Sequence, residues 1–109
     1  MAKLEKKLQD KCIKFLKSKG IYYINQFGNG WSSKGAPDLT VCINGLFVAF
    51  ELKVGENDLQ SDQILHRRRI IKNGGLHYAP YTLEEFKKIV EELLNERPER
   101  ILQSEKRHI

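Results

Sequence analysis

The hydrophobic positions of the chain change their period several times, and each change marks an expected element. Between residues 3 and 19, apolar side chains recur every three or four positions among lysines, which predicts an amphipathic helix ending at Gly20. The aromatic and β-branched run 21–27 predicts a strand. Residues 28–35 are rich in glycine and serine and predict a loop.

The next segment carries the strongest local signal. Asn44-Gly45 lies between two apolar runs, a pattern typical of a two-residue β-hairpin turn. We predict strands over 38–43 and 46–53. One face of this hairpin is wholly apolar and is expected to be core: Leu39, Val41, Ile43, Leu46, Val48, Phe50 and Leu52. The other face is apolar near the turn and charged at the open end, which favours a sheet covered on both sides.

The second half of the chain predicts two helices around a short strand. Ser61 is the expected N-cap of a helix that runs to about Asn73, and 76–79 is the expected strand. Thr82 is expected to cap the last helix, with Glu85 completing a capping box.

The element order is therefore α-β-β-β-α-β-α, which predicts the α/β class: a small mixed β-sheet flanked by helices. We expect one domain over 1–95 and a charged C-terminal tail over 96–109.

Composition narrows the class of protein without naming a function. A chain of 109 residues, 40% hydrophobic and 30% charged, suffices for one modest core. Without an apolar run of membrane-spanning length or a signal-type N-terminus, we expect a cytoplasmic protein. Cys12 and Cys42 lack metal-binding spacing and are expected to be small buried hydrophobes. The net charge of +5 suits a polyanionic partner but does not establish one.

The hairpin register brings acidic side chains together. Counted outward from the turn, Asp38 lies opposite Glu51, with Cβ atoms roughly 5 Å apart, and Lys53 points to the same face. Like charges opposite each other destabilise a ladder, so the pairing indicates a shared cation. Mg²⁺ typically takes one or two carboxylates, and the Leu52 carbonyl could add an oxygen. Lys53 could position water or offset charge on a phosphate.

Simpler interpretations of the same residues remain open. Asp38 could be a turn residue after Pro37, and Glu51 with Lys53 could form an exposed ion pair. A single β-bulge would also shift the pairing and separate the two acids.

The pattern Gly35-x-Pro37-Asp38, Glu51-x-Lys53 and then Gln63 resembles the PD-(D/E)XK nuclease superfamily. Within it, residues 3–95 look most like the virus-type replication-repair nuclease (VRR-Nuc) group in its compact stand-alone form. The resemblance implies a restriction-endonuclease-like core. It also implies a Mg²⁺- or Mn²⁺-dependent endonuclease that acts on structured or branched DNA, as junction resolvases act on Holliday junctions in DNA repair, and that works as a homodimer.

The resemblance also implies roles for particular residues. Asp38 and Glu51 would be metal ligands, Lys53 catalytic and Gln63 supporting. Glu5 on the first helix would be a further metal ligand. A solvated helix face is the alternative for Glu5, and Asp10 is the next acid along that helix.

Several groups are predicted to hold nucleic acid. Ser32, Ser33 and Lys34, in the loop before Asp38, could contact phosphates. Trp31 could stack on a base or anchor a core or dimer contact.

Arg67 and Arg68 are the predicted backbone contacts on the helix after Gln63, and a solvated helix face is their alternative. Two other functions stay open: a non-cleaving, structure-specific DNA-binding module and a nuclease acting on RNA.

Overall fold

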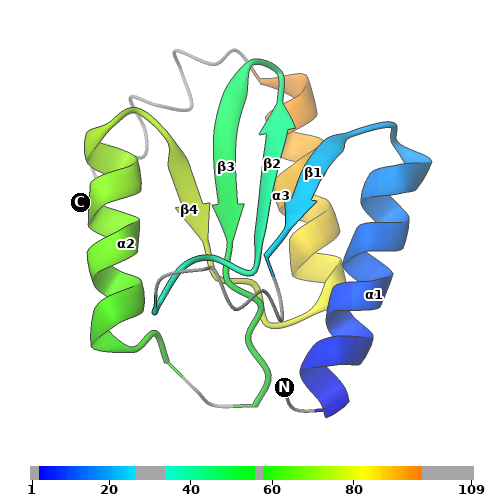
Figure 1. Cartoon of the computed structure of the whole chain (residues 1–109). Helices are drawn as coiled ribbons and strands as arrows, with labels where there is room; N and C mark the ends of the chain where they lie inside the picture. The colour runs from blue at the N-terminus through cyan, green and yellow to red at the C-terminus, as the bar shows by residue number, and fades with distance from the viewer. Residues whose placement is uncertain (1–2, 27–33, 56–57, 97–109) are drawn as a thin grey trace.

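The computed structural model describes residues 3–26, 34–55 and 58–96. Three helices and four strands follow in the predicted order, which confirms the α/β class (Figure 1). The elements are α1 (Lys3–Ser18), β1 (Tyr22–Asn25), β2 (Leu39–Ile43), β3 (Leu46–Phe50), α2 (Ser61–Lys72), β4 (Leu76–Tyr78) and α3 (Leu83–Asn95). None of the helices in this described part of the chain is long and apolar enough to cross a membrane.

The strands form a single mixed sheet in the order β1-β2-β3-β4. The pairs β1–β2 and β2–β3 are antiparallel, whereas β4 runs parallel to β3. The predicted hairpin register is confirmed from Ile43 opposite Leu46 to Leu39 opposite Phe50, without a bulge. Asn44 and Gly45 both have positive φ, 53° and 82°, as the tight hairpin turn requires.

The hydrophobic core lies on the face of the sheet covered by α1 and α3 (Figure 1). All seven residues of the predicted apolar face are buried. The Phe50 ring is central, because its centroid lies 4.7 Å from that of Phe86 on α3 and 5.9 Å from that of Tyr78 on β4. This packing fixes the hairpin against the helices and so fixes where its open end lies.

The opposite face is covered over only half its width, so the prediction of a sheet covered on both sides is correct for one half. On the β3–β4 side, where α2 packs, Ala49 and His77 are buried. On the β1–β2 side Tyr22 is 70% exposed and Cys42 is also exposed. A single helix is too narrow to cover four strands. The expectation of two buried cysteines is therefore wrong for Cys42 and right for Cys12.

Pairing continues beyond the ends of the strands at the open end of the hairpin. The predicted strand to Lys53 is shorter in the structure, and β3 ends at Phe50. The backbone is nevertheless held, because the Glu51 N–H donates to the Tyr78 carbonyl at 2.9 Å and the Lys53 N–H to the Pro80 carbonyl at 3.0 Å. Residues 51–53 are consequently buried and fixed although they lie outside a regular strand.

The helix starts agree with the sequence pattern to different extents. Thr82 caps α3 and accepts the Glu85 N–H at 3.1 Å, as expected. The Glu85 carboxylate accepts its bond from the Tyr81 N–H rather than from Thr82. The N-cap of α2 is Gln60, so the prediction of Ser61 is wrong by one residue.

Candidate active site

Four of the predicted site residues converge at the open end of the hairpin. Asp38 precedes β2, Glu51 and Lys53 follow β3, and Gln63 lies in the first turn of α2. The Gln63 side chain connects Lys53 and Glu51, which both follow β3. Its Oε1 accepts a hydrogen bond from Lys53 Nζ at 2.9 Å, and its Nε2 donates to Glu51 Oε2 at 3.3 Å. The amide therefore bridges the lysine and the acid.

Gln63 is itself held by the start of its helix. Its Oε1 also accepts the Gln60 N–H at 2.8 Å, which satisfies one of the donors left free at a helix N-terminus. This bond accounts for the N-cap at Gln60 instead of Ser61. The amide orientation follows from chemistry, because an ammonium only donates and a carboxylate only accepts. The helix cap and the candidate site thus share one side chain.

Asp38 is fixed by its backbone and by its side chain. Its carbonyl accepts the Gln26 N–H at 2.9 Å, and its Oδ2 accepts the Leu52 N–H at 2.8 Å. The β2–β3 ladder therefore ends in a side-chain bond beyond the Leu39–Phe50 pair. The Asp38 and Glu51 carboxyls are close enough to interact through a hydrogen bond, as the predicted register requires.

Burial dominates the electrostatics of this acid pair. Glu51 is 2% exposed, and its removal from water raises its pKa to about 8, with the Asp38 charge adding to the effect. Burial also raises the pKa of Asp38, and the Glu5 carboxylate contributes to that rise. The Lys53 ammonium opposes both shifts without cancelling them. The pair therefore retains a proton near neutral pH.

The donor set fits a hard divalent cation. Glu51 Oε1 is buried and accepts no hydrogen bond, so one carboxylate oxygen is left for another partner. Within the described ranges, no three acidic, histidine or cysteine side chains form a metal-binding group. Two carboxylates nevertheless suffice for Mg²⁺, because this ion keeps several water ligands.

The first helix contributes less directly. Glu5 is half-buried and acts on Asp38 through its charge, whereas Asp10 is exposed. Four residues after Glu5, the buried Gln9 donates from Nε2 to Asn25 Oδ1 at 2.6 Å. This bond ties α1 to β1 and holds the Glu5 side of the helix toward the sheet.

The predicted phosphate-binding loop is described only at its end. Ser32, Ser33 and Trp31 lie outside the described residues. The Lys34 side chain is 94% exposed, and its Nζ lies 4.0 Å from an Asp62 carboxylate oxygen. An ion pair so exposed is weak, so this ammonium can exchange Asp62 for a phosphate at little cost.

The two predicted arginine contacts differ from each other. Arg67 is half-buried and donates from Nη1 to the His77 carbonyl at 3.0 Å, which satisfies an oxygen of β4. Arg68 is exposed. The two arginines lie on α2 within about one and a half turns of Gln63, on the helix that also borders the acid pair.

Two features near the site go beyond the sequence prediction, and the first is His77. It is 1% exposed, and burial followed by the Arg67 charge lowers its pKa to about 4. Strand alternation alone places His77 on one face of 76–78. Its place beside Ala49 of β3 depends on the parallel β3–β4 pairing, which the sequence does not reveal.

The second is Gly35, a member of the sequence motif with a packing role of its own. It has φ +85°, and a Cβ atom there would lie 2.7 Å from the Asp62 carbonyl carbon and 2.9 Å from the Gln63 backbone nitrogen. Glycine therefore lets the chain leading to Asp38 pack directly on the first turn of α2.

A comparison with solved structures finds a chain titled "VRR_NUC domain" with the same fold. The TM-score is 0.68 at 23% sequence identity, over 83% of this chain and 97% of that chain. No family model and no curated protein matches the sequence. The chain thus has a VRR-Nuc-like fold, in agreement with the resemblance of its motifs.

Proposed function

We propose that this chain, with its VRR-Nuc-like fold, is a divalent-metal-dependent endonuclease that hydrolyses phosphodiester bonds in structured or branched DNA. The observation that carries the proposal is the buried Glu51. Its carboxyl lies beside that of Asp38, retains one oxygen without a donor, and is joined to Lys53 through Gln63. Two neighbouring buried acids destabilise a fold, so their presence favours a ligand that offsets them.

The cation would be Mg²⁺ or Mn²⁺. Asp38, Glu51 and the Leu52 carbonyl would hold it, and Glu5 would be the additional acid on the α1 side. When bound, such an ion activates water and offsets charge on the scissile phosphate. Binding requires the pair to release its proton, because only the carboxylates are ligands.

Lys53 supplies the fixed positive charge of the site. Its side chain is 8% exposed, and Gln63 Oε1 takes one of its donors at 2.9 Å. An ammonium held in this way can stabilise the charge that develops on a phosphate oxygen without having to reorganise. Gln63 acts as the positioning residue for Lys53, because it fixes the direction of the Nζ.

The class of substrate is inferred from the basic and hydroxyl side chains predicted to contact phosphates. Ser32, Ser33 and Lys34, in the segment that precedes Asp38, and Arg67 and Arg68 on α2 are the proposed phosphate contacts. The net charge of +5 supports a polyanionic substrate.

The test is cleavage of labelled four-way junction, flap and linear DNA, and of matching RNA, with Mn²⁺, Mg²⁺ or a chelator. We expect metal-dependent DNA products that disappear in Asp38→Asn and Glu51→Gln, with a native circular dichroism spectrum. Glu91→Gln, exposed on α3, is the matched control. Products retained by both site variants would refute the assigned residues. Retarded DNA without product would favour a binding module, and products from RNA alone an RNA nuclease.

We also propose that the protein is a homodimer. The face of the sheet opposite the core exposes Tyr22 and Ile24 on β1 and Phe47 on β3, which are 70%, 49% and 53% exposed. Large apolar side chains gathered on one face favour a protein contact. Light scattering should give twice the chain mass, and Ile24→Lys should halve it. A monomeric mass with junction cleavage retained would contradict the dimer.

A further inference from the structure

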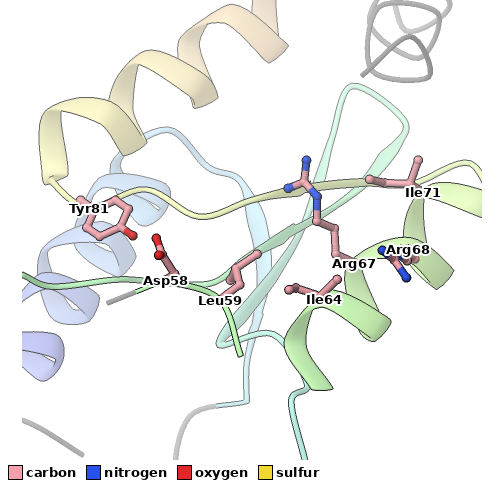
Figure 2. Close-up of a pocket in the computed structure, with 7 residues that line it drawn as sticks. All are labelled: Asp58, Leu59, Ile64, Arg67, Arg68, Ile71 and Tyr81. Carbon is pink, nitrogen blue, oxygen red and sulfur yellow. The ribbon is translucent and has the colours of Figure 1, made fainter. Parts of the chain in front are cut away.

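An open cavity of about 470 Å³ lies beside the proposed active site, between α2 and the connection from β4 to α3 (Figure 2). Each of two walls carries a residue that is next in sequence to one that holds that site. On one wall Ile64 directly follows Gln63, and Arg67 lies four residues after Gln63, about 6 Å along the helix axis. On the other wall Tyr81 follows Pro80, whose carbonyl accepts the Lys53 N–H at 3.0 Å. The cavity therefore lies next to the site, because Ile64 and Tyr81 directly follow residues that hold it.

The two ends of the cavity differ in chemistry. Tyr81 and Asp58 lie together at one end, and Arg67 and Arg68 line the rest toward the other end (Figure 2). Leu59 and Ile64 form an aliphatic surface between them, and Ile71 lies at the arginine end (Figure 2). A flat aromatic group fits the tyrosine end, and an anion fits the arginine end.

Tyr81 and Arg67, which would contact such a ligand, are already held by hydrogen bonds within the protein. The Tyr81 backbone N–H donates to the Glu85 carboxylate at 2.7 Å, which anchors the segment that carries the ring. Arg67 is anchored to the His77 carbonyl at 3.0 Å through Nη1, and a guanidinium has five donors, so others remain for an anion. Little side-chain entropy is lost when anchored groups bind a ligand.

We propose that this cavity binds one unpaired nucleotide of the DNA substrate, next to the scissile phosphate. The base lies against Tyr81 and donates from an amino group to Asp58, and its phosphate lies at Arg67 and Arg68. This inference rests on the proposed nuclease function and deepens it. A base held in a duplex cannot enter the cavity, so the substrate carries an unstacked nucleotide at this position, as flaps and junctions do.

The test uses substrates in which one nucleotide after another near the cleaved bond is replaced by an abasic one. Binding is measured by fluorescence anisotropy without metal, and cleavage with Mn²⁺. Base–aromatic stacking predicts that one abasic position weakens wild-type binding by roughly 5- to 100-fold. Tyr81→Leu should bind the intact substrate more weakly by a similar factor and lose the difference between intact and abasic DNA. Tyr81→Phe should keep the difference.

The arginine end has its own matched pair. Arg68→Gln should lower the salt dependence of binding by roughly one unit of slope, whereas Arg69→Gln should leave it near wild type. Arg69 has the same charge on the same helix but lines a separate depression with Phe47 and Ile70. Equal effects of the two substitutions would count against a phosphate at this end. Urea unfolding of each variant establishes that it is folded.

The outcomes separate this inference from the proposed function. The protein could cleave DNA but show no position at which the effect of an abasic nucleotide disappears in Tyr81→Leu. That result would overturn the nucleotide site and leave the nuclease function standing. Binding with a Tyr81-dependent base effect, but no cleavage with any metal, would overturn the nuclease and leave the nucleotide site.

Discussion

Replacing Glu51 by glutamine should stabilise the metal-free protein while abolishing cleavage. Glu51 has a pKa of about 8 in the folded chain, against an ordinary value of 4.5. A carboxyl whose folded pKa is raised contributes stability that is fully present below 4.5 and is lost as the pH rises through 8. The difference between the two pKa values corresponds to a loss of at most about 5 kcal/mol of folding stability, because each pKa unit corresponds to about 1.4 kcal/mol.

The glutamine keeps the contacts of the protonated acid. Its carbonyl oxygen can accept from Gln63 Nε2, as Glu51 Oε2 does at 3.3 Å, and its amide N–H can donate to the Asp38 carboxylate. Because glutamine does not ionise, the variant does not lose folding stability as the pH rises through 8. We expect the stability of Glu51→Gln relative to wild type to grow by about 4 kcal/mol between pH 5 and pH 9.

The assay is urea unfolding followed by far-ultraviolet circular dichroism at pH 5, 7 and 9 with a chelator present. Glu91→Gln is the control, because its exposed carboxyl should give a difference that does not change with pH. Adding Mn²⁺ should stabilise the wild type and leave Glu51→Gln nearly unchanged, since the ligand is missing. A pH-independent difference for Glu51→Gln would show that Glu51 is already ionised in the folded protein and would refute the burial argument.

Individual contacts lead to three more predictions. Lys53→Ala should lower the cleavage rate far more than DNA affinity, and Gln63→Ala should lower it in the same direction because the Lys53 Nζ loses its acceptor; comparing single-turnover rates with anisotropy separates the two effects. Gly35→Ala should destabilise the fold by about 2 kcal/mol or more in urea unfolding, because a Cβ at φ +85° meets the backbone of Asp62. His77 binds its proton mainly when unfolded, so stability should fall as the pH drops from 6.5 toward 4, and His77→Phe should remove that part of the acid loss in urea titrations.

The sequence predicts local structure well and packing between distant segments less well. The Asn44-Gly45 turn determines the hairpin register, and the register by itself places the two acids beside each other. The N-cap at Gln60 escapes prediction because it depends on Gln63, whose side chain is oriented by Lys53 and Glu51. Such a bond is decided by tertiary contacts, which local propensity does not contain.

The same limit applies to the surroundings of the site. The place of His77 follows from the parallel β3–β4 pairing, and the role of Gly35 from the approach of two segments far apart in sequence. The exposure of Cys42 follows from the width of one helix against four strands. Each depends on how α2 returns to the sheet, which the pattern of apolar residues leaves open.

The site residues also hold the fold together, and this determines which substitutions are informative. Asp38 ends the hairpin ladder by accepting the Leu52 N–H, and Gln63 caps α2 while it holds Lys53. Removing either side chain leaves a backbone donor without its acceptor, which costs about 1–3 kcal/mol when the donor is buried. An alanine at these positions therefore weakens fold and chemistry together. Asp38→Asn retains an oxygen for Leu52 and changes mainly the charge, so loss of cleavage in a variant at least as stable as the wild type can be assigned to ligand chemistry.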